Sequence, residues 1–249
     1  MARFFVDELP CEGSRYTLTG ENADHAKVLR LRPGEGVTLC DGKGLDCLCT
    51  VAESGVLIAG ASLPCPAEPA VQASVFLAFP KADKAEHVIQ KAVELGAAEI
   101  VLFLSRYCVS RPDDKSLSKK LDRWQKIARS AAEQSRRGVI PPVRAVDTFA
   151  GALAEAAKAD VPILFYENEE HLSLRDALEE VGGGLRSGRS AQNLRVSLMT
   201  GSEGGFSGEE IEQAKAAGLK ICTLGPRILR CETAPLAGLT AVMYALGEL

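Results

Sequence analysis

The glycine-rich stretch at residues 201–207 has the clearest chemical pattern in the sequence, and it follows an apolar run at residues 196–199. A strand that ends at glycines and leads into a helix is where open α/β sheets bind ligands. The stretch contains Glu203 but no Lys or Arg. Because a phosphate-binding loop uses a lysine, the pattern favours a nucleoside without phosphates, with Glu203 on a ribose hydroxyl, a backbone amide or a cationic group. The alternative is a plain strand–turn–helix corner that binds nothing.

A second loop, at residues 224–235, follows a predicted strand at residues 219–223 and contains Arg227, Arg230 and Glu232. If a right-handed crossover joins this strand to the preceding one, the two strands are parallel and both loops lie at one edge of the sheet. The two loops then face each other. The alternative is a surface ion pair beside a helix with a threonine N-cap and a proline in its first turn.

A third loop follows the apolar run at residues 161–165 and is rich in carboxylates. Glu167 lies nearest to the end of this predicted strand, so we expect its side chain to face a ligand at the same edge. Glu169 and Glu170 are better explained as a solvated acidic corner.

Strands and helices alternate from residue 71 onwards, which indicates an α/β fold with a parallel sheet covered by helices on both faces. Apolar runs predict the strands, and amphipathic spacing with capping residues predicts the helices. The predicted strands cover residues 74–79, 100–104, 161–165, 196–199 and 219–223, with a short one from residue 143. The predicted helices cover residues 84–95, 116–138 (capped by Ser116 or Ser118), 149–158, 173–181, 208–217 and 235–246. Residues 182–193 are rich in Gly and Ser and predict a surface loop.

Residues 1–70 contain short apolar runs separated by glycine-containing turns, a pattern typical of a small β-barrel. The predicted strands cover residues 4–6, 37–40, 45–51 and 56–59, and one helical segment covers residues 22–30. Three prolines lie within residues 63–69, which predicts a stiff linker. We therefore expect two domains, at residues 1–70 and 71–249.

Charge is distributed unevenly along the 249 residues, whose net charge is −4. Residues 111–144 carry ten Lys or Arg and only four Asp or Glu. Such a cluster suits a phosphate backbone, although basic faces of helices are more often simply solvated. Trp124 has the spacing of a core residue rather than of a base-stacking platform.

The eight cysteines are scattered, with no CxxC pair and no histidine at zinc-ligand spacing. They predict reduced thiols and no metal site. The first residues do not have the pattern of a signal peptide, and no apolar run has the length of a membrane span. The expected location is therefore cytoplasmic, without a membrane partner.

Seven stretches along the chain form a pattern that can be compared with known families. They are Arg3-Phe4-Phe5, His25-Ala26-Lys27-Val28-Leu29-Arg30, Gln90-Lys91-Ala92-Val93-Glu94-Leu95-Gly96, Arg123-Trp124-Gln125-Lys126-Ile127-Ala128, Ala131-Ala132-Glu133-Gln134-Ser135-Arg136-Arg137, residues 201–207 and residues 224–234. Together they resemble the RsmE-type 16S ribosomal RNA methyltransferases of the knotted SPOUT superfamily, over nearly the whole chain and in the order of the family. Two positions depart from the usual pattern of the family, because Ser202 replaces a proline and Cys231 replaces a threonine.

The resemblance implies a PUA-like N-terminal barrel that grips RNA and a C-terminal SPOUT domain with a trefoil knot. It also implies a homodimer, S-adenosyl-L-methionine as methyl donor, and methylation at N3 of a uridine in the 16S rRNA of the small ribosomal subunit. The donor fits the first loop, because it is a nucleoside without phosphates that carries a cationic sulfonium.

This function needs groups that stabilise charge on the uracil and align the methyl group. We expect Arg230 to stabilise that charge, because a guanidinium can donate two hydrogen bonds, and Glu232 either to orient Arg230 or to act as the base. The expected donor-binding residues are Glu167, Thr200, Gly201, Glu203, Gly204, Leu224, Gly225, Ile228, Leu229 and Arg230. The expected RNA-binding residues are Arg3, Lys27, Arg30, Arg32, Arg136 and Arg137.

Two other functions remain open from the sequence. A nucleotide-dependent enzyme on a doubly wound sheet would carry a GxGxxG motif after the first strand, but residues 79–84 contain no glycine. A non-catalytic RNA-binding or ribosome-assembly protein is harder to distinguish, because gripping RNA requires only the basic elements.

Overall fold

The computed structural model describes residues 1–53, 55–179 and 193–249. Contacts between residues divide the chain into two compact units: Met1–Glu68 with Ala132–Ile140, and Pro69–Ala131 with Pro141–Leu249. The first unit thus includes a returning segment, 132–140, that the predicted ranges 1–70 and 71–249 did not contain. The predicted Gly/Ser-rich loop at residues 182–193 lies outside the described residues except at its last position.

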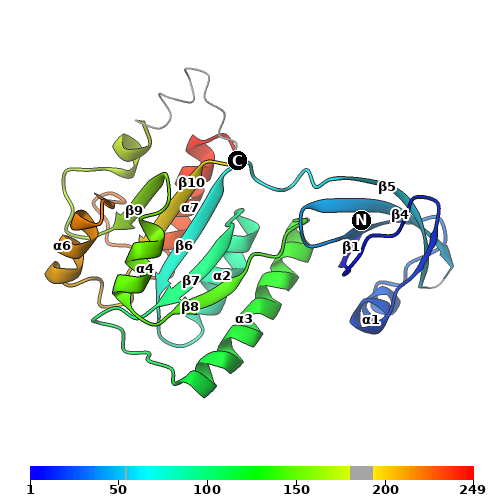
Figure 1. Cartoon of the computed structure of the whole chain (residues 1–249), viewed down its shortest axis with the longest axis horizontal. Helices are drawn as coiled ribbons and strands as arrows, with labels where there is room; N and C mark the ends of the chain where they lie inside the picture. Colours follow the sequence, from blue (N-terminus) through cyan, green and yellow to red (C-terminus); the bar gives the residue numbers. More distant parts are fainter. Residues whose placement is uncertain (54, 180–192) are drawn as a thin grey trace. The chain divides into compact units, whose positions relative to one another are not determined.

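The first unit is a curled, half-barrel sheet of five strands with the order β1-β3-β4-β5-β2 (Figure 1). Strands β1 and β2 are its two edges, so within the described residues the expected barrel is not closed. Helix α1 buries Ala26, whereas its apolar residues Val28 and Leu29 are exposed. The elements are β1 (Ala2–Phe5), β2 (Arg15–Thr17), α1 (Gly20–Leu29), β3 (Gly36–Cys40), β4 (Leu45–Glu53) and β5 (Val56–Pro64).

Alternating side chains of these strands form the core of the first unit, which includes Phe4, Leu39 and Leu57. Beside this core lies a network of buried charges. The guanidinium of Arg3 donates two hydrogen bonds of 2.7 Å to the carboxylate of Asp46. It also donates to the carbonyl of Arg137 at 3.2 Å. This last contact holds the returning segment against the strands.

Glu68 binds the returning segment a second time. Its carboxylate accepts hydrogen bonds from Arg137 Nη2 and from the backbone N–H groups of Gly138 and Val139, at 2.8, 2.8 and 3.0 Å. Charge-assisted bonds of this kind are stronger than neutral ones. They explain why a segment far along the chain belongs to the N-terminal unit.

The second unit is a six-stranded sheet with the order β11-β9-β10-β6-β7-β8. All its strand pairs are parallel, as the alternating pattern predicted. The strands are β6 (Gln72–Ala78), β7 (Glu99–Phe103), β8 (Val143–Val146), β9 (Val161–Phe165), β10 (Arg195–Thr200) and β11 (Lys220–Cys222). After β6 the chain adds strands on one side, and from β9 onwards on the other. The carboxyl ends of β6 and β10 therefore flank the point where the strand order reverses, where open α/β sheets bind ligands.

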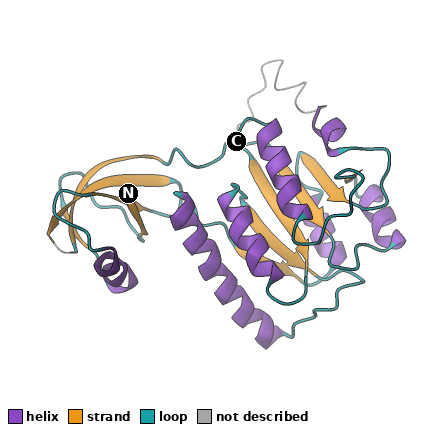
Figure 2. Ribbon diagram, turned by 180° about the vertical axis from the view of Figure 1, so that it is seen from behind, coloured by secondary structure: helices purple, strands orange, loops and turns teal. Residues whose placement is uncertain are grey.

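Helices cover both faces of this sheet (Figure 2). Helix α7 packs on β6 and β10 beside α2, and α4 packs on β6, β7, β8 and β10. The helices are α2 (Lys84–Glu94), α3 (Asp114–Ser135), α4 (Phe149–Ala156), α6 (Gly208–Ala216) and α7 (Ala234–Ala245), with a further helical stretch at 174–179. Trp124 of α3 is buried, with its ring 6.3 Å from that of Phe79, which confirms its interpretation as a core residue.

Two predicted helix starts are confirmed by their caps. Thr148 accepts a hydrogen bond from the N–H of Gly151, and Ser207 forms a reciprocal capping box with Glu210. Helix α3 begins earlier than predicted, because the carboxylate of Asp113 accepts from the N–H of Ser116 at 2.7 Å. Thr233 precedes α7, but its side chain makes no capping hydrogen bond. Among the described helices, none combines the length and the apolar character that crossing a membrane requires.

Candidate active site

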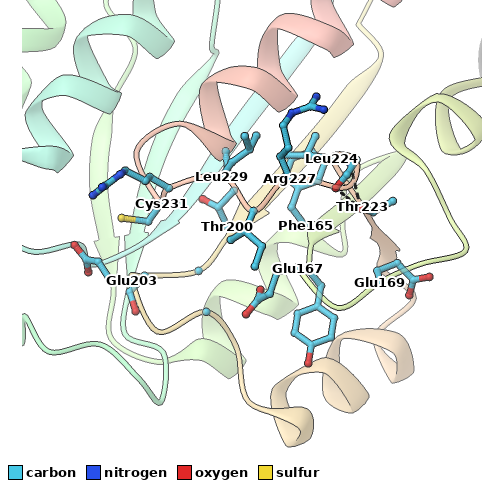
Figure 3. Close-up of a pocket in the computed structure, with 18 of the residues that line it drawn as sticks. Phe165, Glu167, Glu169, Thr200, Glu203, Thr223, Leu224, Arg227, Leu229 and Cys231 are labelled. Carbon is cyan, nitrogen blue, oxygen red and sulfur yellow. Dashed lines mark hydrogen bonds between the residues drawn. The ribbon is translucent and has the colours of Figure 1, made fainter.

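A cavity of about 830 Å³ opens at the carboxyl edge of the parallel sheet. The loops after β9, β10 and β11 line it, together with the first residue of α2, as expected from the parallel arrangement of these strands. In Figure 3 Glu203 and Cys231 lie at one end of the cavity and Glu169 lies at the other. Its volume is in the range typical of small-molecule sites. The lining residues are Lys84, Phe165, Tyr166, Glu167, Glu169, Glu170, Thr200, Gly201, Ser202, Glu203, Gly205, Thr223, Leu224, Gly225, Pro226, Arg227, Ile228, Leu229, Arg230, Cys231 and Ala234.

The cavity brings together all the predicted donor-binding residues except Gly204. A Cβ at Gly204 would lie 2.6 Å from the Cβ of Tyr107. The absence of a side chain at Gly204 thus allows the loop to pack against its neighbour, and a role for Gly204 in donor binding stays a prediction. Thr200 lines the cavity, but its hydroxyl donates to the carbonyl of Phe76 at 3.4 Å.

Two glycines shape the wall of the cavity. Gly205 has φ of +65°, and a Cβ there would overlap the carboxylate of Glu167. Gly225 has φ of +101° and open space around its α-carbon. Only glycine adopts such angles readily, so a side chain at either position would strain the loop.

The loop after β10 is fixed along its length. Its last residue, Phe206, stacks on Phe103 with ring centroids 6.4 Å apart and also contacts Phe149. Beyond it, Glu210 accepts hydrogen bonds from the N–H groups of Ser207 and Arg106, both at 2.8 Å. The loop therefore has a defined path between strand β10 and helix α6.

A lysine that no sequence motif marks, Lys84, joins two of the loops. Lys84 Nζ lies 3.1 Å from Glu203 Oε1 and 3.0 Å from Glu232 Oε2. Glu203 also accepts from the N–H of Lys81 at 3.0 Å. Cys231 completes the group, because its thiol donates to Glu232 Oε2 at 3.3 Å and lies 3.6 Å from Lys84 Nζ.

The pKa values in this cluster are shifted away from neutrality. Burial alone would raise the pKa of Glu203, but hydrogen bonds from its own backbone and from Lys81, with the charge of Lys84, lower it. The same balance of burial against backbone and Lys84 contacts lowers the pKa of Glu232. Hydrogen bonds to Glu232 and Glu203 raise the pKa of Lys84, and burial raises that of the Cys231 thiol to about 12. Glu232 is thus poorly suited to act as a base at neutral pH.

Arg230 lines the cavity and is exposed. No side chain of the described residues forms a hydrogen bond or ion pair with its guanidinium. The expectation that Glu232 orients Arg230 is therefore not met, because Glu232 pairs with Lys84 instead. The side chain of Arg227 points away from Glu167 and Glu203 (Figure 3).

The predicted RNA-binding residues of the first unit divide into two groups. Lys27, Arg30, Arg32 and Arg136 are exposed, so they remain candidates. Arg3 and Arg137 are not available to a phosphate: their side chains are 8% and 4% exposed and each is bound to a carboxylate. The sequence shows their charge but not their burial, and their assignment to RNA binding is corrected here.

Comparison with known proteins identifies the class. A family described as the RNA methyltransferase domain matches residues 67–243, and one described as the RNA methyltransferase PUA domain matches residues 18–55. The chain is therefore an RNA methyltransferase by family, with a PUA domain before its catalytic domain.

Relatives that match nearly the full length of the chain share one name. The chain is 31% identical to the ribosomal RNA small subunit methyltransferase E of Bacillus subtilis, over 98% of this chain and 96% of that protein. It is 33% identical to the protein of that name from Mycobacterium bovis, over 96% and 90%. The chain belongs to the ribosomal RNA small subunit methyltransferase E (RsmE) family, which confirms the resemblance found in the sequence.

Solved structures agree with this assignment. The ribosomal RNA small subunit methyltransferase E from Neisseria gonorrhoeae, bound to S-adenosyl methionine, superposes with a TM-score of 0.79 at 32% identity. The match covers 98% of this chain and 97% of that one. A putative methyltransferase from Legionella pneumophila, in complex with the same cofactor, gives 0.80 at 27% identity, again over 98% and 97%. The PUA-like sheet followed by a SPOUT-type parallel sheet is thus established, while the knot stays a prediction.

Lys84 does not stand out when each loop is considered only with its own strand. The signal was nevertheless present: Lys84 follows the first strand of the α/β domain, and the loops after parallel strands share an edge. Only the order β10-β6, which sequence does not give, brings Lys84 beside Glu203.

Proposed function

We propose that this protein transfers a methyl group from S-adenosyl-L-methionine to N3 of a uridine in the 16S rRNA of the small ribosomal subunit. The observation that supports it most is the composition of the cavity. The carboxylates Glu167 and Glu203, the positive-φ glycines Gly205 and Gly225, and Arg230, which has no side-chain partner among the described residues, line one space. The chain also belongs to a family whose members are named as methyltransferases of small-subunit ribosomal RNA.

The lining fits the proposed donor. Carboxylates suit the ribose hydroxyls and the ammonium group of such a molecule, and the wall at Gly205 and Gly225 permits contact between backbone and an adenine ring. When bound, S-adenosyl-L-methionine supplies a methyl group on a cationic sulfur. Residues Gly201, Leu224 and Leu229, which line the cavity, would hold its adenosine part through their backbone.

Arg230 carries the charge-stabilising role in this proposal. Uridine N3 must lose its proton before it can accept a methyl group, and the negative charge then spreads to the neighbouring carbonyl oxygens. A guanidinium can donate two hydrogen bonds to such an oxygen, and preorganised donors aimed at developing charge are a major source of catalysis. Arg230 is exposed in the cavity and unpaired among the described side chains, so it is free to do this.

The proton leaves to solvent in our proposal. Glu203 and Glu232 have lowered pKa values, and Lys84 and Cys231 have raised ones. These four groups are therefore unsuited to accept a proton at neutral pH, and Glu232 acts through its partner Lys84 rather than as the base. The reaction rate should then rise with pH as N3 ionises.

The remaining partners follow from the same proposal. The exposed cations Lys27, Arg30, Arg32 and Arg136 would contact the phosphate backbone of the RNA. The protein would work as a homodimer in the cytoplasm, where small subunits are assembled. A non-catalytic assembly role is the competing proposal, and a binding measurement separates the two.

The test is methylation of unmodified small subunits by the purified protein with methyl-labelled S-adenosyl-L-methionine. Digestion of the RNA and mass spectrometry of its nucleosides should yield 3-methyluridine. Calorimetry should show binding of the donor in the absence of RNA. Failure to bind millimolar donor would support the assembly role, and a methyl group on another atom would contradict the N3 assignment alone.

A further inference from the structure

We propose that Lys84 is a positioning residue of the methyl-transfer reaction, which acts by holding the carboxylates of Glu203 and Glu232 and so keeps Arg230 available for the acceptor base. This inference rests on the proposed function, because it concerns the same cavity. It adds a residue that neither the sequence pattern nor the family resemblance had pointed to.

The geometry places Lys84 between the two functional loops. It is the first residue of α2, which follows β6, while Glu203 follows β10 and Glu232 lies just before α7. Its ammonium group is within 3.1 Å of both carboxylates. A single cation thus connects the loop that lines the donor side with the loop that carries Arg230.

The charges explain why this connection matters for Arg230. Glu232 is only two residues from Arg230, so its carboxylate is the nearest candidate in the chain to neutralise that guanidinium. In the structure it binds Lys84 instead, and Arg230 has no side-chain partner among the described residues. Without the ammonium group, two carboxylates with lowered pKa values would remain charged, and Glu232 would be free to pair with Arg230.

A general structural role explains the cluster less well. The side chains of Lys84, Glu203 and Glu232 are 26%, 26% and 22% exposed. Ion pairs that water can reach contribute little to folding. Three converging charges from three separate segments at the strand-order reversal are better explained by control of the cavity.

The test compares Lys84→Met with wild-type protein in steady-state methylation of unmodified small subunits. We expect kcat to fall about 100-fold, the scale of loss caused by small misplacements of reacting groups, with a smaller change in KM for the donor. Lys84→Arg, which keeps the charge, should restore most of the activity. The double variant Lys84→Met/Glu232→Gln should be at least about tenfold faster than Lys84→Met, because the released carboxylate that captures Arg230 is then neutral.

Lys91→Met is the matched control. Lys91 lies on the same helix and pairs with Glu94 at 2.9 Å, outside the cavity, so its replacement should leave kcat unchanged. Thermal unfolding and calorimetric binding of the donor should stay close to wild type for all four variants.

Each other outcome overturns the proposal. An unchanged kcat for Lys84→Met removes Lys84 from the reaction. A double variant no faster than Lys84→Met means that Lys84 acts on the substrate directly, and loss of cooperative unfolding makes it a structural residue. If wild-type protein itself fails to methylate rRNA, the proposed function is wrong. The wild-type assay therefore distinguishes a wrong function from a wrong role for Lys84.

Discussion

Each unit contains one cluster in which cationic side chains pair with carboxylates, but the two clusters serve different purposes. In the N-terminal unit Arg3 and Asp46 form a bidentate pair whose side chains are 8% and 7% exposed, with Arg137 and Glu68 beside them. In the cavity Lys84 binds two carboxylates that remain about a quarter exposed. The first cluster joins distant segments of the chain, and the second lies where a ligand would enter.

Two features distinguish a structural from a functional ion cluster: how deeply the charges are buried, and whether each charge has a partner within the protein. The presence of charge alone does not distinguish them. Each charge of the first cluster has its partner inside the protein, which is the condition for tolerating a buried ion. The cavity contains two cations that its carboxylates do not engage, since neither Arg227 nor Arg230 has a side-chain partner among the described residues. An unpaired, accessible guanidinium is available to a substrate.

The largest effect should come from breaking the buried cluster. Asp46→Ala leaves the guanidinium of Arg3 buried without its carboxylate, so the free energy of unfolding should fall by about 3–5 kcal/mol. Urea denaturation measures this change. Arg15→Ala, at an exposed pair whose side chains are 63% and 62% accessible, is the control and should cost at most about 1 kcal/mol. Equal losses at the two sites would contradict the distinction.

The next effect is on catalysis. Arg230→Ala should lower kcat by about 10²–10³-fold, the usual result of removing one charge-stabilising donor. The free energy of unfolding should not change, because no side chain of the described residues depends on Arg230. Methylation assays with calorimetric binding of the donor make the measurement, and Arg230→Lys should recover part of the rate. If Arg230→Ala loses stability instead of activity, the two clusters do not differ as described.

The smallest effect should be a dependence of stability on pH. Glu203 and Glu232 have pKa values lowered from an ordinary 4.5. Their contribution is therefore complete above about pH 4.5 and is lost as the pH falls through the lowered values in the folded protein. The difference in unfolding free energy between wild type and Glu203→Gln/Glu232→Gln should be below about 1 kcal/mol at pH 7 and should vanish in acid, once the pH is below the lowered pKa values of the folded protein. A difference in unfolding free energy that grows as the pH falls would contradict this pH dependence.

Hydrophobic pattern and turn chemistry predicted most elements of the second unit, because buried parallel strands are continuous apolar runs with clear ends. Strand β2 was missed for the opposite reason. It has only three residues, lies at an edge and keeps Arg15 and Thr17 exposed, so no apolar run marks it. The returning segment 132–140 was also unpredictable, since it depends on contacts of Glu68 that are distant in sequence.

The site was predictable wherever a residue follows its own strand. This rule selected Glu167, Glu203 and Arg230, and the parallel sheet brings them to one cavity, while their roles stay predictions. Lys84 required the strand order, and Arg3 required knowledge of burial. Both depend on tertiary packing, which overrides what charge and spacing suggest locally.

The fixed path of the loop after β10 has a thermodynamic consequence. Strand β10 holds one end, the ring of Phe206 and the capping box of Ser207 and Glu210 hold the other, and Glu203 is bound at its centre. The conformational entropy of this loop is therefore lost during folding rather than when a ligand arrives. A preorganised wall of this kind spares ligand binding the cost of ordering it, so a small, flexible nucleoside can bind with most of its contact energy retained.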